Sequence, residues 1–410
     1  MSAARPVRPG PLAGVRVLDL TSVLMGPYCT QVLSDMGAEV IKLEPPAGDT
    51  SRHVPPMHAP AAGATFRWVN RGKRAIVVDL ATPRGRDVCL RLAARCDVFV
   101  HSIRPQAIAS LGLAYDAVRA SNPSIVYCSL LGFGREGRYS GGAAYDDTIQ
   151  ALSGLAWLQS QLAGKPQYVA TVAADKVCGI TGAYAILGAL FHRQRTGEGQ
   201  EVDVPMFETM ASFALVEHLT GAFYDPPESA PVYRRVISPE RRPYATADGH
   251  LAVLVYNDKQ WQRFARIAGR AELLDDARFA SMTARAANID AYYGTIAQIL
   301  STRTSGEWLD ALGPAGIPVA RVNSTEDLFS DPHLADVGFF DEHDDPLDGR
   351  VRMPGFTVRF RGSPTAPAAP APALGQDTLA VLRESGFTAA EIDALVGERV
   401  VSAAPPAPGR

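Results

Sequence analysis

Short apolar runs alternate with longer helical patterns along the first third of the chain. Such runs are typical of parallel strands covered by helices on both faces. They lie at Val15–Leu20, Glu39–Leu43, Ala75–Leu80, Asp97–His101 and Ser124–Leu130. Between them, helices are expected from about Pro27 to Met36 and from about Pro83 to Arg95, with proline suited to a helix start. The pattern predicts an α/β fold with a Rossmann-like large domain.

A helix rich in small residues is expected over 176–195, where Gly179, Ala183, Ala185 and Gly188 leave room for close packing. Residues 196–199, which contain two glycines, end it, and Gln200–Val204 starts a further strand.

The pattern changes near Ser238. An antiparallel hairpin is expected from Tyr244 to Tyr256, followed by helices through about Leu312. The Pro- and Ala-rich stretch Pro364–Leu374 predicts a stiff surface connector, and a last helix is expected near Ala389–Leu395. We therefore expect a large domain over 1–220, a smaller α+β domain over 221–328, and a return segment and tail over 329–410.

Composition describes a globular chain, since 47% of its 410 residues are hydrophobic and 20% are charged. Lysine and arginine number 40 against 43 acidic residues, which gives no reason to expect nucleic acid as a partner. No apolar run suggests a signal sequence or a membrane span. The five cysteines include no CxxC pair and predict buried thiols in a cytoplasmic protein.

A nucleotide cofactor is disfavoured, because the turn after the first strand, residues 21–26, carries one glycine where the dinucleotide fingerprint needs three. NAD and FAD are therefore not expected. The histidines form no HxH or HExxH motif, so no metal is expected, and the Gly-x-Ser-x-Gly elbow of hydrolases is absent.

Several segments between residues 11 and 200 together carry a family resemblance. The first ones are PLAGVRVLDL from Pro11, GAEVIKLEPP from Gly37 and NRGKR from Asn70; the others are Arg104-Pro105 with Leu111-Gly-Leu113, YDDTIQALSG from Tyr145, VAAD ending at Asp175, and RTGEGQ from Arg195. In this order they resemble the family III CoA-transferases, also called the CaiB/BaiF family, which includes formyl-CoA transferases and α-methylacyl-CoA racemases. The resemblance spans about residues 10–400.

Asp175 has two readings. By position alone it is an N-cap or first-turn aspartate of the following helix, which stabilises the helix by about 1 kcal/mol. The resemblance implies that it is also the catalytic carboxylate, which carries the acyl group and then CoA. The helix N-terminus is expected to lower the pKa of Asp175 and to keep it ionised.

The resemblance implies that CoA moves from an acyl-CoA donor, such as succinyl-CoA or acetyl-CoA, to a small carboxylic acid. Coenzyme A is then the co-substrate, and no metal, NAD, FAD or ATP is required. The backbone N–H groups of Gly132, Gly134 and Gly137 are candidate donors to the transient anions, with ordinary loop glycines as the alternative.

CoA phosphates need fixed positive charge. Candidate cations are Arg71, Lys73, Arg74 and Arg104, with solvated surface charge as the alternative for each. The resemblance places CoA contacts at three turns: Val23 and Leu24; Val78, Asp79, Leu80 and Ala81; and Ser102, Ile103 and Arg104.

This chain differs from formyl-CoA transferases at four positions. It has Leu24 in place of a glutamine, Pro45 in place of an arginine, Leu131 in place of a lysine and Ser110 in place of an arginine. The glycine-rich flap of those enzymes is also not evident around 238–244. These departures argue against formate and oxalate and favour a larger or less polar acid. Specificity is expected to depend on side chains around Tyr244, Tyr256 and Asn257.

Three alternatives stay open. A racemase would need an acid/base pair, and its histidine aligns with Tyr145, whose phenol is a poor base at neutral pH. Asp146 and Asp147 could form an acid/base pair in a related isomerase or lyase, although adjacent acids on a helix point in different directions. A non-catalytic CoA-binding homologue would be expected to lack Asp175, which is present.

The resemblance also implies a homodimer. In it each chain forms a ring that interlocks with the ring of the second chain, and the active site lies between the large domain of one chain and the small domain of the other.

Overall fold

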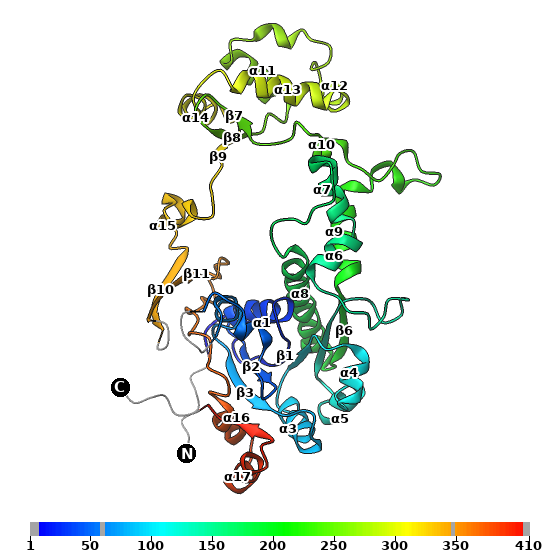
Figure 1. Cartoon of the computed structure of the whole chain (residues 1–410), viewed down its shortest axis with the longest axis vertical. Helices are drawn as coiled ribbons and strands as arrows, with labels where there is room; N and C mark the ends of the chain where they lie inside the picture. The colour runs from blue at the N-terminus through cyan, green and yellow to red at the C-terminus, as the bar shows by residue number, and fades with distance from the viewer. Residues whose placement is uncertain (1–7, 58–61, 346–348, 405–410) are drawn as a thin grey trace. The chain divides into compact units, whose positions relative to one another are not determined.

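The computed structural model describes residues 8–57, 62–345 and 349–404. The chain divides into two compact units, described separately below (Figure 1). The large unit comprises residues 1–153, 169–213 and 337–410, and the small unit comprises 154–168 and 214–336. This division differs from the predicted boundaries, because residues 154–168 group with the small unit. They contain α7 (Leu155–Ala163), which contacts α10 (Arg234–Ile237) there.

A seven-stranded sheet forms the centre of the large unit, with strand order β12-β3-β2-β1-β4-β5-β6. All neighbouring pairs are parallel except β12 with β3. The strands are β1 (Arg16–Leu20), β2 (Glu39–Glu44), β3 (Arg74–Val78), β4 (Val98–His101), β5 (Val126–Leu131), β6 (Gln200–Pro205) and β12 (Val401–Ser402). The predicted α/β class is confirmed, and each predicted strand is present within about two residues of its expected bounds.

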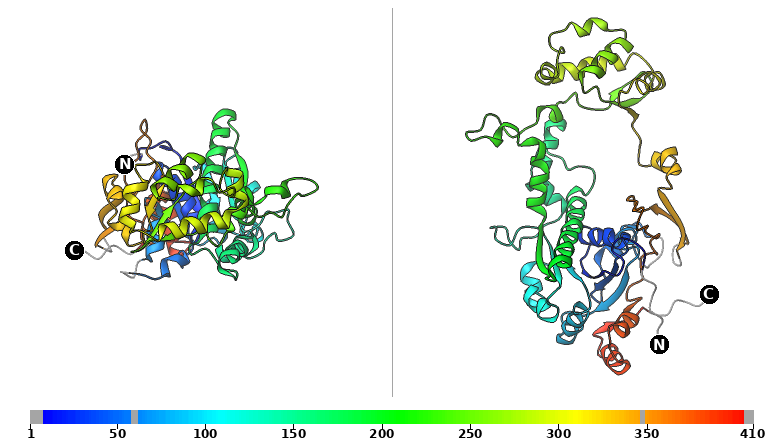
Figure 2. Two further views of the ribbon diagram at one scale, coloured as in Figure 1. Left: turned by 90° about the horizontal axis from the view of Figure 1, so that it is seen from above. Right: turned by 180° about the vertical axis from the view of Figure 1, so that it is seen from behind.

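Helices and a separate hairpin complete the large unit. The helices are α1 (Met25–Asp35), α2 (Ala64–Val69), α3 (Pro83–Ala93), α4 (Pro105–Ser110), α5 (Tyr115–Ser121), α6 (Asp146–Leu152), α8 (Ala173–Thr196), α16 (Thr378–Glu384) and α17 (Ala389–Gly397). A helix α9 (Met206–His218) follows β6, and β10 (Phe340–Asp345) pairs with β11 (Gly349–Pro354) in an antiparallel hairpin. Figures 1 and 2 show α16 and α17 beside the edge of the sheet that β3 and β12 form.

The core of the large unit explains why the apolar runs are strands. Leu18, Ile41, Ile76 and Phe99 are all fully buried, one from each of four adjacent strands, and they pack in one cluster with α3, α16 and α17. All five cysteines are buried free thiols, as predicted. The stretch 364–374 is less exposed than expected of a surface connector, because the Pro372 carbonyl accepts a hydrogen bond from Arg52 and the Ala369 carbonyl accepts one from Gly72.

Helix α8 packs against α1, β5 and β6 through small residues. A Cβ added to Gly179 would lie 2.7 Å from the Met25 carbonyl oxygen, so only glycine permits this approach. Gly188, in contrast, has nothing within 4 Å. α8 is long and apolar enough to span a membrane by length and composition alone. This is weak evidence for a membrane span, because a core helix that packs on a sheet passes the same test.

The small unit contains a three-stranded antiparallel sheet in the order β7-β8-β9, with the strands at β7 (Tyr244–Ala245), β8 (His250–Val253) and β9 (Val319–Arg321). The predicted hairpin is therefore present. Besides α7 and α10, its helices include α11 (Asp258–Ile267), α12 (Met282–Ala287), α13 (Ile289–Leu300), α14 (Ser305–Leu312) and α15 (Pro332–Asp336). Phe264, Phe279, Tyr292 and Trp308 form its core.

Candidate active site

The strand order reverses direction between β1 and β4, and a pocket lies at the carboxyl ends of these two strands. In open α/β sheets ligands bind at such a switch point. The pocket has a volume of about 180 Å³ and is open to solvent. Six of the predicted catalytic and CoA-binding residues line it: Val23, Leu24, Ser102, Ile103, Arg104 and Asp175.

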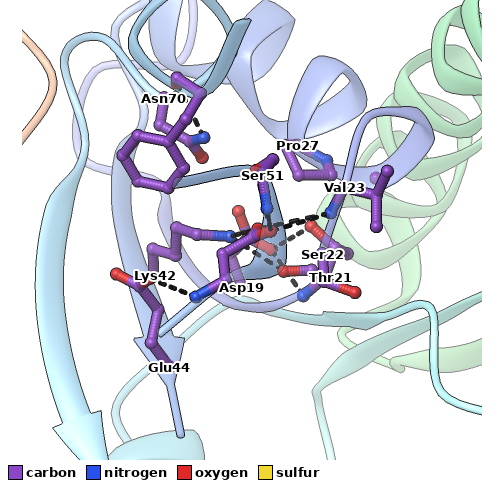
Figure 3. A network of polar contacts seen from close by, with 12 residues as sticks. Asp19, Thr21, Ser22, Val23, Pro27, Lys42, Glu44, Ser51 and Asn70 are labelled. Carbon is purple, nitrogen blue, oxygen red and sulfur yellow. Dashed lines mark hydrogen bonds and ion pairs between the residues drawn. The ribbon is translucent and has the colours of Figure 1, made fainter. Parts of the chain in front are cut away.

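The turn after β1 carries a conformation that its sequence disfavours. Val23 has φ of +69°, a left-handed value that is rare for a β-branched residue. Its N–H donates to both carboxylate oxygens of Asp49, at 3.2 and 3.3 Å. Asp49 in turn accepts from the buried Lys42 ammonium at 2.9 Å, and Lys42 also donates to the Thr21 carbonyl (Figure 3). Residues distant in sequence therefore hold the turn in place.

The turn after β4 is held by a buried histidine. Nδ1 of His101 accepts from the Ile103 N–H at 3.2 Å, which leaves the ring proton on Nε2, 3.1 Å from the Ser129 hydroxyl. Burial, together with the charge of Arg135, lowers the pKa of His101 to about 3, so the ring is neutral at physiological pH. Ser102 Oγ accepts from the Ser22 N–H and links this turn to the turn after β1.

Asp175 lies in the first turn of α8, where Val172 is the N-cap. Its position as a first-turn residue is as expected, but the N-cap reading is wrong. The backbone N–H of Asp175 donates to Oδ1 of Asp146 at 3.0 Å, and Gln150 donates to Oδ2 of Asp146 at 2.6 Å. The Asp146 carboxylate therefore satisfies one of the free N–H groups at the start of α8.

The expected direction of the Asp175 pKa shift is also wrong. Burial and the nearby charge of Asp146 raise the pKa of Asp175 to about 6. Leu130, Phe133 and Met206 are apolar residues that line the same pocket. At pH 7 about nine tenths of the Asp175 side chains would still be ionised. The carboxylate is thus less hydrated and more basic than an exposed aspartate.

The neighbours of Asp146 differ in placement. Asp147 is exposed while Asp146 is buried, which agrees with adjacent helical acids pointing in different directions. Tyr145 lines the pocket and is 68% exposed. Tyr145 and Asp175 both line the pocket, and no histidine is among the described residues that line it. A racemase-like site would have a histidine at the position of Tyr145.

The basic side chains predicted to bind CoA phosphates, Arg71, Lys73 and Arg74, are bound within the protein instead. The Lys73 ammonium is fully buried and donates to Asp19, Thr30, Asn70 and the Pro27 carbonyl, at 2.7 to 3.1 Å. Burial lowers its pKa to about 8. As a direct phosphate contact Lys73 is therefore a wrong prediction, because every donor direction of its ammonium is taken by the protein.

The side chains of Arg74 and Arg71 are also buried in the large unit, where they form ion pairs. Arg74 is 4% exposed and pairs with Glu39 and Glu384, so its prediction as a CoA contact is also wrong. Arg71 is 3% exposed, pairs with Asp35 at 2.6 Å and stacks on Trp68. Of the four candidate cations, Arg104 alone lines the pocket.

The third predicted CoA turn lies at the same edge of the sheet, two strands from β1. Val78 is fully buried and pairs with Val401 of β12, so its side chain cannot contact a ligand. Asp79 and Leu80 are half-buried and Ala81 is exposed. These three remain candidate contacts outside the pocket.

Among the predicted glycine donors, Gly132 lines the pocket. The N–H of Gly134 donates to Glu208 and that of Gly137 to the Gly134 carbonyl, so neither is free for an anion. Within the described ranges, no group of three or more His, Cys, Asp and Glu side chains could hold a metal ion.

Comparisons with known proteins show which family the chain belongs to. A sequence model described as CoA-transferase family III matches residues 12–378. The chain belongs to family III of the CoA-transferases. A succinate–glutarate CoA-transferase of Agrobacterium fabrum is 34% identical over 396 residues, covering 92% of this chain and 96% of that protein. A succinyl-CoA:mesaconate CoA-transferase of Haloarcula hispanica is 34% identical, covering 92% and 97%.

Solved structures support the same family. Rv3272 of Mycobacterium tuberculosis has a TM-score of 0.81 at 28% identity, covering 92% of this chain and all of that one. A CaiB/BaiF family protein of Brucella suis has a TM-score of 0.76 at 30% identity, with the same coverage. The chain is thus an enzyme of the family III CoA-transferases, which use CoA thioesters as co-substrates.

Sequence reasoning missed the residues that hold the site. Asp49 and His101 carry no recognised motif, and the segment that contains Asp146 gives no sign of its contact with Asp175. Glu44 and Arg52 form a buried ion pair that also binds the Asp49 N–H. The segment GDTSR from Gly48 offers one signal that could have found Asp49, because Asp followed by Ser two residues later is typical of a capped turn.

Proposed function

We propose that the enzyme transfers CoA from succinyl-CoA to a second dicarboxylic acid, with Asp175 as the covalent carrier. The observation that carries this proposal is the position of Asp175, a half-buried carboxylate of raised pKa in the pocket at the switch point. The names of the relatives, which pair succinyl-CoA or succinate with glutarate or mesaconate, support the substrate class.

The first half-reaction needs one nucleophile and no proton. A carboxylate oxygen of Asp175 attacks the thioester carbonyl, the C–S bond breaks, and CoA thiolate leaves a mixed anhydride on Asp175. The thiolate then attacks the Asp175 carbonyl carbon. Succinate leaves as a carboxylate, and an aspartyl-CoA thioester remains.

The second half-reaction reverses these steps with the acceptor. The acceptor carboxylate attacks the aspartyl thioester and expels CoA thiolate, which then attacks the acceptor acyl carbon and frees Asp175. One thioester replaces another, so neither ATP nor redox chemistry is needed. Desolvation of Asp175 makes its oxygen more nucleophilic than that of a hydrated carboxylate.

Pocket residues have distinct roles in this proposal. Val23 and Leu24 on one side, and Ser102, Ile103 and Arg104 on the other, bind the thioester end of CoA, with Arg104 supplying positive charge. Asp79, Leu80 and Ala81 meet the more distant part of the cofactor along the same sheet edge. A homodimeric assembly and a cytoplasmic location stay predictions that rest on the resemblance and on cysteine usage.

Incubation with succinyl-CoA and a panel of acids tests the proposal. Mass spectrometry should detect new thioesters of glutarate, mesaconate or a similar diacid, and a CoA adduct on the peptide that contains Asp175. Buffer made with deuterium oxide separates the racemase alternative, because a racemase introduces deuterium at the α-carbon and a transferase does not. An enzyme that forms no thioester with any diacid, or that forms one without the adduct, would contradict the proposal.

A further inference from the structure

Gln150 is a buried amide on α6 that makes three hydrogen bonds within the large unit, and it is 1% exposed. Its Nε2 group donates to Oδ2 of Asp146 at 2.6 Å and to the Thr171 carbonyl at 3.2 Å. Its Oε1 accepts from the Val169 N–H at 2.9 Å. Asp146 and Thr171 present acceptors and Val169 presents a donor, so this position needs a side chain that carries both N–H groups and an oxygen.

These contacts join two segments of the large unit that are separate in sequence. The chain leaves this unit after Ser153, just beyond α6, and returns to it at Val169. Residues 169–172 form neither helix nor strand and lead directly into α8, which packs beside α6 (Figure 1). The bonds of Gln150 to Val169 and Thr171 tie the returning segment to α6, so they fix the place where α8 begins.

The same amide holds Asp146 at the start of α8. Oδ2 of Asp146 accepts from Gln150, and Oδ1 accepts from the backbone N–H of Asp175 at 3.0 Å. Two hydrogen bonds therefore connect Gln150 to the candidate nucleophile. Gln150 is not among the described residues that line the pocket, so its effect on Asp175 passes through Asp146 and the start of α8.

We infer that Gln150 is a positioning residue for Asp175 in the attack on the thioester. The inference rests on the proposed function, in which Asp175 is the nucleophile. Attack requires the reacting atoms to lie about 3–3.5 Å apart in the correct alignment, and a displacement of about 1 Å can lower a rate about 100-fold. Gln150 limits such displacement, because it fixes both the segment before α8 and the carboxylate that binds the Asp175 N–H.

The rate constant of adduct formation tests this role. Enzyme is mixed with succinyl-CoA and quenched at set times, and mass spectrometry follows the CoA adduct on the peptide that contains Asp175. Gln150→Met keeps the length of the side chain and removes its polar groups, so it should lower the rate constant about 10- to 100-fold. The rate constant, unlike the amplitude, does not depend on how much of the enzyme is folded. An unchanged rate constant would overturn the inference.

Gln31→Met is the matched control. Gln31 is a second buried amide of the large unit, 2% exposed, and it donates to an aspartate four residues away, Asp35. It is not among the described residues that line the pocket. The control loses a similar buried hydrogen bond and should keep the wild-type rate constant. An equal fall in both variants would show a general effect of losing a buried amide, and the inference would be overturned.

Saturation with succinyl-CoA separates positioning of Asp175 from binding of CoA. Asp49 and His101 hold the turns that contain the proposed CoA contacts, so a change at Gln150 leaves these turns in place. The succinyl-CoA concentration that gives half of the maximal rate constant should therefore be unchanged in Gln150→Met. A higher concentration with an unchanged maximal rate constant would assign Gln150 to CoA binding and overturn the inference. If Gln150→Met does not fold, Gln150→Asn, whose amide is one methylene shorter, replaces it with the same expected results.

Failure of the proposed function gives a different result, because the wild-type enzyme then forms no adduct. Hydrogen–deuterium exchange of the full chain, read by mass spectrometry, still tests whether Gln150 fixes the start of α8. The amides of residues 169–175 should exchange at least about tenfold faster in Gln150→Met than in the wild type, the effect of losing a hydrogen bond. In Gln31→Met they should exchange at the wild-type rate. Equal exchange in the three proteins would contradict the inference.

Discussion

The backbone N–H of Asp175 donates a hydrogen bond to Oδ1 of Asp146 at 3.0 Å, across two helices that are separate in sequence. One contact therefore does two things. It satisfies a free N–H at the start of α8, and it brings a second negative charge near the Asp175 side chain. Burial and the charge of Asp146 raise the pKa of the Asp175 side chain, while the Asp146 carboxylate binds the Asp175 backbone.

Asp175→Asn is expected to lower kcat for CoA transfer by at least about a thousandfold, because an amide cannot form the anhydride or the aspartyl thioester. Initial rates with succinyl-CoA and an accepted diacid measure this. Asp147→Asn is the matched control, since Asp147 is an exposed acid in the same segment as Asp146, and it should keep wild-type rates. Comparable turnover by both variants would rule out the covalent mechanism.

The pH dependence of kcat/KM should show an acid limb near pH 6, the pKa to which burial and Asp146 raise Asp175. Below that pH the nucleophile is protonated, so the rate falls about tenfold per pH unit. Asp146→Asn keeps an oxygen for the Asp175 N–H and removes the like charge. The limb should therefore move to lower pH, and a limb that stays in place would show that burial alone sets the pKa.

Stability should respond to Asp175 with a defined sign. Because the pKa of Asp175 in the folded protein lies above its ordinary value, the folded state holds the proton more tightly than the unfolded chain does. The free energy of unfolding therefore falls as pH rises from about 4 to about 6. Asp175→Asn should raise the melting temperature at pH 7.5 and leave it nearly unchanged at pH 4, as measured by calorimetry.

Lys73→Met should destabilise the fold by about 3–5 kcal/mol, because it leaves the buried Asp19 carboxylate without its cation. Urea denaturation measures the loss. Lys165→Met, at an exposed lysine, is the control and should change the free energy of unfolding by less than about 0.5 kcal/mol. If Lys73→Met instead weakened acyl-CoA binding at unchanged stability, the phosphate-binding role would be restored.

Replacements of Val23 should reveal the strain in the turn after β1. Glycine adopts a φ of +69° freely, whereas alanine keeps the steric cost of an L-residue. Val23→Gly should therefore be more stable to unfolding than Val23→Ala by about 1 kcal/mol. Chemical denaturation of the two variants compares them directly, and a less stable glycine variant would indicate that no strain is stored there.

Local patterning determined much of this protein. Apolar runs and helix signals placed the strands of the sheet, the helices α1, α3 and α8, and the hairpin of the small unit, because burial on both faces of a parallel sheet requires continuous apolar sequence. The resemblance carried by the motif that ends at Asp175 indicated the candidate nucleophile, and the same resemblance placed candidate CoA contacts at Val23 and Ser102, which line the pocket. These features are short in sequence and need no distant partner.

Tertiary structure alone decided the electrostatics. Whether Lys73 and Arg74 meet solvent or a carboxylate depends on Asp19, Glu39 and Glu384, which the fold brings to them from other elements. The helix end predicted a lowered pKa for Asp175, but desolvation and Asp146 outweighed the helix dipole, whose effect is about 0.3–1 kcal/mol. Charge and burial act through space rather than along the chain, so they become defined only once the chain is folded.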